Sequence, residues 1–281
     1  MRTFDTPDPI SVRISLQAGS VYLRTVPDGR TVVEVRPADP GSQADVAAAA
    51  ATRVDCTGNR LTVEGPRHRW WQTLGGGAAV AVHVDLPEGS RLELQGGAVE
   101  FDCAGTFGET RVQLAAGGAR IASTQALRAD TASGDLVVDR VIGDLRVRSA
   151  SADVRVGNVG GIVDVKSASG NVTLGQTSGT VRLIGASSDI SVERALGSVG
   201  IKLASGNVRI GQAVRGSISL HAASAGLDLG IAQGTAARLD VTSGSGRVHS
   251  SLPPTTGPGP ADELLEVHVR TGSGDVSVRR A

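Results

Sequence analysis

Between residues 133 and 246 the chain repeats one pattern of polar and apolar positions. A short polar phrase of the Ser-Gly-Asp type recurs in steps of 18 residues and finally of 19. The phrases begin at Ser133, Ser151, Ser169, Ser187, Ser205, Ser224 and Ser243. A second set of glycines recurs with nearly the same period half a repeat away. A fixed period of this length is typical of a repeat architecture.

Within each repeat the apolar residues lie two positions apart. Val172 and Leu174 form one such pair, and Val181 and Leu183 form the next. This spacing is the period of a β-strand with one buried face. Between the pairs lie Gly, Asp and Asn, which close tight turns. Each repeat is therefore predicted to be two short strands and two turns.

Stacking the repeats brings equivalent aliphatic residues into inward columns, because one unit cannot bury its apolar face alone. Two columns begin Leu145, Val163, Val181 and Val147, Val165, Leu183. Two more begin Leu136, Val154, Val172 and Val138, Val156, Leu174. The predicted fold is an all-β solenoid of the β-helix or β-roll kind, with about 18 residues and two short strands per coil.

The outward positions also form columns. Arg146, Asp164 and Arg182 would alternate in charge along one of them, a favourable cross-strand arrangement. The neighbouring column is basic. It reads Arg148, Lys166, Ile184, Lys202 and His221.

The chain is predicted to divide into an N-terminal β-rich cap, residues 1–88, and a solenoid, residues 89–281. An Ala-rich stretch after a serine predicts one short helix over residues 42–52. Aromatic residues agree with this division, because none follows Phe107 and a narrow coil has little room for rings. Residues 253–262 are rich in Pro and Gly and predict a loop.

The charge is balanced, with 28 basic and 28 acidic residues. Such a chain has no general attraction to nucleic acid or to an anionic membrane, so neither is expected as a partner. The longest apolar run, Ala78 to Val84, is too short to span a bilayer, and the first residues lack the apolar core of a signal peptide. We therefore expect a cytoplasmic protein. Cys56 and Cys103 are expected to be small buried hydrophobic residues.

One irregular segment, residues 66–77, carries the candidate binding residues Arg67, Arg69, Trp70 and Trp71. A solvent-facing tryptophan pair beside arginines could stack on a sugar or a base. The alternative is that the indoles cover the open end of the first coil.

The sequence contains no nucleophile motif of the Gly-x-Ser-x-Gly kind and no phosphate-binding loop. Its five histidines show no metal-ligand spacing, and His83 and His268 are expected at outward strand positions. Calcium is the alternative chemistry, because rolls of two nine-residue repeats per coil bind Ca²⁺ in their turns. The turn column here is only partly acidic, which favours a structural role in the turns over calcium binding. It reads Asp135, Asp153, Asn171, Asp189 and Asn207.

The chain resembles the bacterial putative-adhesin family of β-strand repeat proteins. The resemblance rests on Leu86-Pro87-Glu88-Gly89-Ser90, on Ser133-Gly134-Asp135-Leu136 and on Ser273-Gly274-Asp275-Val276. It covers nearly the whole chain, and the family is a domain of unknown function without a catalytic motif to transfer.

These observations predict a non-enzymatic scaffold or binding module that docks a protein or glycan partner, with no catalytic residue, metal or cofactor. Self-association through the solenoid ends is a further option, because exposed strand edges can pair with another copy. The alternative function is a carbohydrate-active or calcium-binding solenoid. A carbohydrate-active solenoid would need clustered carboxylates, and the outer columns show no such cluster.

Overall fold

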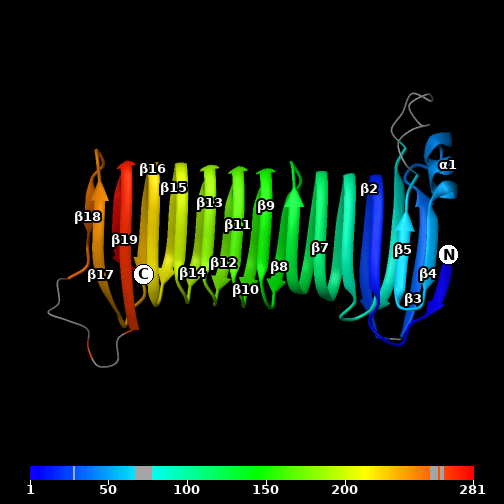
Figure 1. Ribbon diagram of the computed structural model, residues 1–281, viewed down its shortest axis with the longest axis horizontal. Coiled ribbons are helices and arrows are strands. Elements are labelled where there is room, and N and C mark those ends of the chain that lie inside the picture. The colour runs from blue at the N-terminus through cyan, green and yellow to red at the C-terminus, as the bar shows by residue number, and fades with distance from the viewer. Residues whose placement is uncertain (28, 67–77, 254–258, 260–262) are drawn as a thin grey trace. The chain divides into compact units, whose positions relative to one another are not determined.

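The computed structural model describes residues 1–27, 29–66, 78–253, 259 and 263–281. The chain forms two compact units, Met1–Arg140 and Val141–Ala281. Both are built from β-strands, and α1 (Gln43–Ala51) is the one helix among the described residues (Figure 1). The prediction of an all-β solenoid with one short helix is confirmed. The predicted domain boundary at residue 88 stays a prediction.

The helix forms where the sequence places it. Ser42 is its N-cap, and its hydroxyl accepts a hydrogen bond from the backbone N–H of Asp45 at 3.3 Å. The Asp45 carboxylate accepts hydrogen bonds from the backbone N–H groups of Asp39 and Ala79, both at 3.0 Å. The helix is therefore held to the preceding turn and to the residue just before β6 (Val80–Pro87).

The strands of the first unit are organised around β2. They are β1 (Arg2–Asp5), β2 (Ser11–Val26), β3 (Arg30–Pro37), β4 (Arg53–Thr57), β5 (Arg60–Glu64), β6 (Val80–Pro87), β7 (Arg91–Thr131) and β8 (Asp135–Val141), whose last residue begins the second unit. Strand β2 pairs in parallel with β5 and β6 on one side and with β7 on the other. The first long strand of the chain therefore lies between two later segments.

Two bidentate ion pairs hold β2 to its neighbours. The Arg13 guanidinium donates to Glu93 on β7 at 2.7 and 3.1 Å. The Arg24 guanidinium donates to Asp85 on β6 at 2.8 and 3.0 Å. These pairs contact β2 from opposite sides and fix its register against both neighbours.

The second unit repeats the predicted coil. Its strands are β9 (Leu145–Ser151), β10 (Val154–Val159), β11 (Val163–Ser169), β12 (Val172–Thr177), β13 (Val181–Ser187), β14 (Ile190–Ala195), β15 (Val199–Ala213), β16 (Gly216–Ile231), β17 (Thr235–Ser243), β18 (Val248–Ser250), β19 (Glu263–Ser273) and β20 (Val276–Arg280). Val163 lies opposite Leu145 on one side and Val181 on the other, so the 18-residue period is the register. Val163 and Val181 are 0% and 1% exposed. Each such buried aliphatic contributes about 1.5–3 kcal/mol to stability.

The acidic turn residues tie successive coils together. Oδ1 of Asp153 accepts a hydrogen bond from the backbone N–H of Asn171 at 2.8 Å, and Oδ1 of Asp189 does so from Asn207 at 2.7 Å. A third pair joins Asp275 to the N–H of Arg247 at 2.8 Å. These carboxylates therefore satisfy backbone donors that would otherwise lack a partner in the ladder.

In the second unit, from Ala152 onward, every second coil along the stack has a glycine with positive φ in its turn. In stacking order the middle residues of the turn phrase are Ala152, Gly170, Ser188, Gly206, Ala225 and Gly274. The three glycines have φ of +107°, +132° and +131°, whereas no described residue other than glycine has a positive φ. A Cβ on Gly170 would also meet the carbonyl oxygen of Ala152 in the preceding coil. Two turn conformations therefore alternate along the stack.

The last coil in space is not the last coil in sequence. Strand β19 pairs in parallel with β16 on one side and with β17 on the other. Strand β20 likewise lies between β16 and β18. The segment 263–280 is therefore inserted between two coils that precede it in the chain, and β17 and β18 form the end of this unit.

Candidate functional site

Outward residues of six successive strands in the second unit form a mostly basic column. Parallel pairing places Arg148 of β9 beside Lys166 of β11, and Lys202 of β15 beside His221 of β16. Its sixth member, Arg270, is contributed by β19. We name this column the basic ladder. It comprises Arg148, Lys166, Ile184, Lys202, His221 and Arg270. Neighbouring strands are about 4.8 Å apart, so the cationic groups recur along a line at short intervals.

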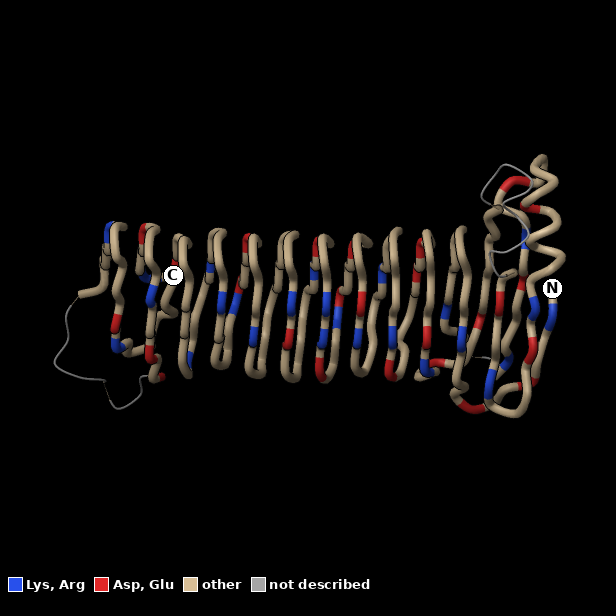
Figure 2. The backbone as a smooth tube through the Cα atoms, turned by 45° about the horizontal axis from the view of Figure 1, so that its top comes forward, with Lys and Arg blue, Asp and Glu red and all other residues tan. Residues whose placement is uncertain are grey.

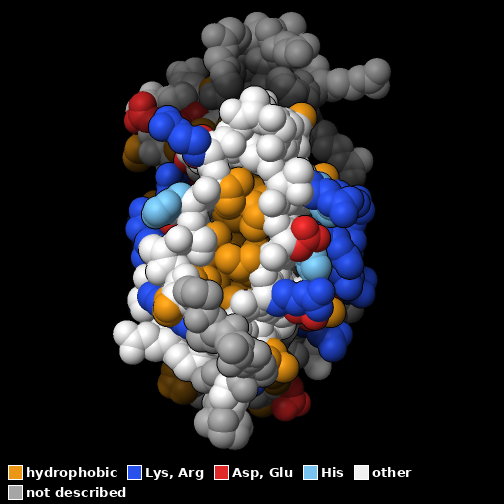
Figure 3. Space-filling view, turned by 90° about the vertical axis from the view of Figure 1, so that its left-hand side faces the viewer, with side chains coloured by type: hydrophobic (Ala, Val, Ile, Leu, Met, Phe, Trp, Pro, Cys, Tyr) orange, Lys and Arg blue, Asp and Glu red, His pale blue; other side chains and the backbone are white. Residues whose placement is uncertain are grey.

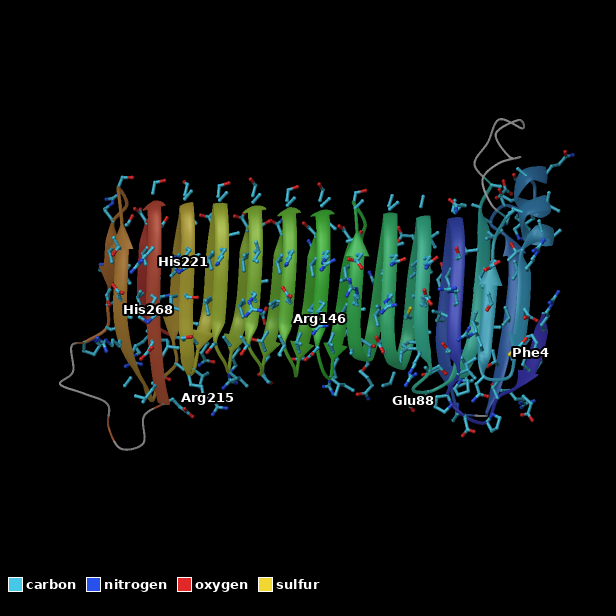
Figure 4. The ribbon with its side chains drawn as sticks, viewed as in Figure 1. Phe4, Glu88, Arg146, Arg215, His221 and His268 are labelled. Carbon is cyan, nitrogen blue, oxygen red and sulfur yellow. The ribbon has the colours of Figure 1, made fainter. Side chains whose placement is uncertain are left out.

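The basic ladder faces solvent and is not neutralised. All six side chains are exposed, including the apolar Ile184 at 39%. None of the five polar members forms an ion pair with any residue that the structure describes. Figure 4 labels Arg146 on β9 and His221 on β16, and Figure 2 shows basic positions recurring over neighbouring coils of this unit. The ladder is therefore a line of positive charge open to a partner.

The adjacent column adds further basic charge. Arg146 and Arg182 lie on either side of Asp164, in the register that the sequence predicts. No ion pair joins these three residues, and Oδ1 of Asp164 is buried without a hydrogen-bond partner. Asp164 is the one acidic residue in the two columns from β9 to β16. The face therefore keeps a clear excess of positive charge.

Two shallow depressions lie along the ladder. One, of about 800 Å³, is lined by Lys202, His221, Thr242 and Arg270 together with residues of the adjoining turns. The other, of about 290 Å³, is lined by residues of β13, β15 and β16 that include Arg182 and Lys202. Basic side chains therefore border concave surface, which brings a bound anionic group close to more than one of them.

A larger but less charged groove lies on the opposite sheet, which β10, β12, β14 and the later halves of β15 and β16 form. It has a volume of about 1170 Å³, and its outward side chains are Arg155, Thr173, Ser191, Arg209 and Asp228. The turn residues Asp189 and Asp275 at its rim already accept backbone hydrogen bonds. Among the described residues, no group of three or more His, Cys, Asp or Glu side chains could hold a metal ion. The turn carboxylates thus have a structural role that accounts for them.

The predicted binding residues Arg67, Arg69, Trp70 and Trp71 lie outside the described residues. His83 and His268 lie at outward strand positions, as predicted. The His83 ring stacks on Tyr22 with centroids 4.9 Å apart. This pair joins β6 to β2.

The cysteines differ from each other. Cys103 is buried, as expected, and burial strongly raises the pKa of its thiol. Cys56 is only half-buried, so the expectation of a fully buried residue is wrong for it. Burial, followed by the nearby Asp55, raises the pKa of the Cys56 thiol as well. Both thiols are therefore held in the protonated, poorly nucleophilic form at neutral pH.

Sequence reasoning identified five members of the basic ladder and missed Arg270. The missing member lies 49 positions after His221, far from the 18-residue period, because β19 is inserted beside β16. The sequence carried only a partial signal, in that the phrase at Ser273-Gly274-Asp275 matches the repeat more closely than the one at Ser243 does.

No helix in the part of the chain that the structure describes is long and apolar enough to cross a membrane.

The solved structures that are similar to this chain include three bacterial proteins. A putative adhesin from Bacteroides fragilis is 10% identical, with 99% of this chain and 95% of that chain covered and a TM-score of 0.25. A putative cell adhesion protein from Clostridium sporogenes is 11% identical, with 100% and 98% covered and a TM-score of 0.19. A putative lipid binding protein from Parabacteroides distasonis is 12% identical, with 100% and 95% covered and a TM-score of 0.26.

No curated protein shows significant similarity to this sequence. A family model, Toastrack DUF4097, matches residues 33–279, which is most of the chain and includes every member of the basic ladder. The family resemblance seen in the Ser-Gly-Asp phrases is thereby confirmed. The chain belongs to the Toastrack DUF4097 family.

Proposed function

We propose that this protein is a non-enzymatic scaffold that binds an acidic partner, a protein or a glycan, along the basic ladder. The observation that carries the proposal is the row of exposed basic side chains from β9 to β19 that form no ion pair with a described residue. Each coil adds one position at a fixed interval, so a partner with regularly placed anionic groups can contact several coils at once.

The chemistry of the ladder favours acidic groups over neutral sugars or bases. No Phe, Trp or Tyr follows Phe107, so the second unit has no ring on which a sugar or a nucleobase could stack. Recognition here must come from charge and hydrogen bonds. We therefore retain the expectation that nucleic acid is not the partner.

A binding role also fits the composition of the ladder better than catalysis does. Its members are two arginines, two lysines, one histidine and one isoleucine, without the paired carboxylates of a glycosidase or a nucleophile next to a base. The cytoplasmic location and the binding role of Arg67, Arg69, Trp70 and Trp71 stay predictions.

The test removes three positive charges from the basic ladder and compares this variant with one that loses three positive charges elsewhere. The ladder variant is Arg148→Gln, Lys166→Gln and Lys202→Gln. The matched control is Arg194→Gln, Arg209→Gln and Arg247→Gln, three exposed arginines on the other sheet or its adjoining turn that make no ion pair with a described residue. A basic residue near an anionic surface contributes about 1 kcal/mol, so losing three should weaken binding by roughly 100-fold.

Binding is measured at two salt concentrations with dextran sulfate, polyglutamate, neutral dextran and an oligonucleotide. We expect salt-sensitive binding to dextran sulfate or polyglutamate that the ladder variant loses and the control keeps. The stronger of these two probes indicates whether a glycan or a protein is the partner class. Equal losses in both variants, or binding to the oligonucleotide alone, would contradict the proposal.

A further inference from the structure

The end of the second unit has an open strand edge. Strand β17 (Thr235–Ser243) pairs with β19 on one side, and no described strand pairs with its other side. No described strand therefore occupies its outer backbone N–H and C=O groups. Such an edge is a ready template for another strand unless charge or a cover blocks it.

The same end exposes the apolar interior. Leu239 and Val241 are half-buried and Val248 is 50% exposed. Their register partners in the adjoining coil, Val267, Val269 and Val276, are only 0–1% exposed. Figure 3, which looks onto this end, shows hydrophobic side chains at its centre within a polar rim. A contiguous exposed apolar patch with a polar rim is typical of an interaction surface.

The exposed edge is complementary to itself. A two-fold axis through Leu239 would place one β17 antiparallel to a second β17. In that register Arg238 faces Asp240, Ala237 faces Val241 and Leu239 faces its own copy, so opposite charges meet on the outer face and apolar residues meet on the inner face. The register also pairs Thr235 with Ser243, so the two strands match over their full length.

The two charged residues are available for this contact. Arg238 is exposed and forms no ion pair with a described residue. The Asp240 side chain lies 3.5 Å from Nδ1 of His268 but is 60% exposed, which leaves carboxylate oxygen open to a second partner.

We propose that two copies of this chain associate through β17 as an antiparallel, two-fold symmetric pair. The contact extends across the axis the row of paired strands that ends with β16, β19 and β17, with Arg238–Asp240 pairs on both sides of the Leu239 contact. It also covers Val248 of each copy, which lies on the same end face. An isologous contact of this kind closes on itself and gives a dimer rather than a filament. It leaves Arg148, Lys166 and Lys202 of the basic ladder free, so it is independent of the proposed function.

The test uses complementary charge reversals in the full chain, with mass measured by light scattering after size exclusion over a range of protein concentrations. In Arg238→Asp, aspartate faces Asp240 twice; in Asp240→Arg, arginine faces Arg238 twice. Like charges directly opposite each other destabilise strand pairing, so each variant alone should dimerise roughly tenfold or more weakly than the native chain. Mixing the two variants restores both pairs, and we expect a heterodimer that native mass spectrometry detects.

Recovery in the mixture shows that both variants are folded, and Arg209→Asp, on the other sheet, serves as a control that should leave the dimer intact. A native chain that is monomeric at every concentration would overturn the proposal. So would open-ended polymers, or a dimer that survives either single reversal. Binding of dextran sulfate by a monomeric chain would leave the proposed function standing while this interface failed.

Discussion

The Arg13–Glu93 pair is a single side-chain contact that helps to fix the position of strand β2 against β7. Its two hydrogen bonds join β2 to β7 across 80 positions of sequence. The hydrogen bond from Arg13 lowers the pKa of the Glu93 carboxyl, with a further contribution from the Arg13 charge. Both side chains are partly exposed, so solvent screening keeps the contribution of the pair modest.

We predict that Glu93→Gln lowers the free energy of unfolding by under about 1 kcal/mol at neutral pH. Because the pKa of Glu93 is lowered by folding, the stabilisation is present above the carboxyl pKa of the unfolded chain, about 4.3, and is lost as the pH falls through the lower folded value. Urea unfolding at pH 7 and pH 3 measures this free energy. The difference in free energy of unfolding between the variant and the native chain should largely disappear at pH 3.

Glu109→Gln is the matched control for that measurement. Glu109 is exposed on the same strand and forms no ion pair with a described residue. It should change stability little at either pH. A Glu93→Gln effect that is equal at both pH values would show that the ion pair is not its cause.

At the scale of the coil, spacing predicts register well and turn conformation poorly. The 18-residue period predicted that Val163 lies between Leu145 and Val181, because side-chain alternation and coil length together determine which residues stack. The alternation of two turn conformations was not predicted. Ser-Gly-Asn and Ser-Ser-Asp read as equivalent turn phrases, and the difference between Gly170 and Ser188 appears only in φ.

We predict that Gly170→Ala destabilises the second unit. The positive φ alone costs about 1–3 kcal/mol for a residue with a side chain, and contact of the new Cβ with the Ala152 carbonyl adds to this. The measurement is the urea midpoint followed by circular dichroism.

Gly200→Ala is the paired substitution, because Gly200 lies at an outward strand position without a positive φ. A Cβ there meets Oγ of Ser219 at 3.4 Å and the Val181 carbonyl oxygen at 3.9 Å, which is ordinary contact. We expect a change within about 0.5 kcal/mol. Equal destabilisation by the two substitutions would contradict the role of turn conformation.

At the scale of the whole molecule, the order of segments along the chain and their order in the stack differ. In the first unit β2 lies between β5 and β7, and in the second unit β19 lies between β16 and β17. Periodicity could not reveal this, because it records spacing along the chain and not which coil a later segment joins. The same limit explains why Arg270 was missed while Arg148 to His221 were found.

We predict that deleting residues 263–281 disrupts a segment that the deletion does not touch. Strand β17 would lose β19, its one pairing partner among the described strands. Residues 235–243 should therefore lose protection from hydrogen exchange, measured by mass spectrometry, although they are still present.

The comparison for that experiment is a truncation after Val278, which keeps β19 and most of β20. Protection of residues 235–243 should survive in it. If the longer deletion also keeps protection there, then β17 has docked directly on β16 and the inserted segment is dispensable.

The insertion of β19 and β20 has a consequence for synthesis on the ribosome. A chain that emerges N-terminus first can add coil upon coil as far as β16, since each new strand finds its neighbour already made. Strands β17 and β18 emerge next, but their place is on the far side of a layer that does not yet exist. Until residues 263–280 have left the exit tunnel, these strands stay unpaired, or they pair with β16 and are later displaced by β19 and β20. The final step of folding at this end therefore follows the synthesis of residues 263–280, and in that interval the nascent chain presents an unpaired strand edge to chaperones and to other nascent chains.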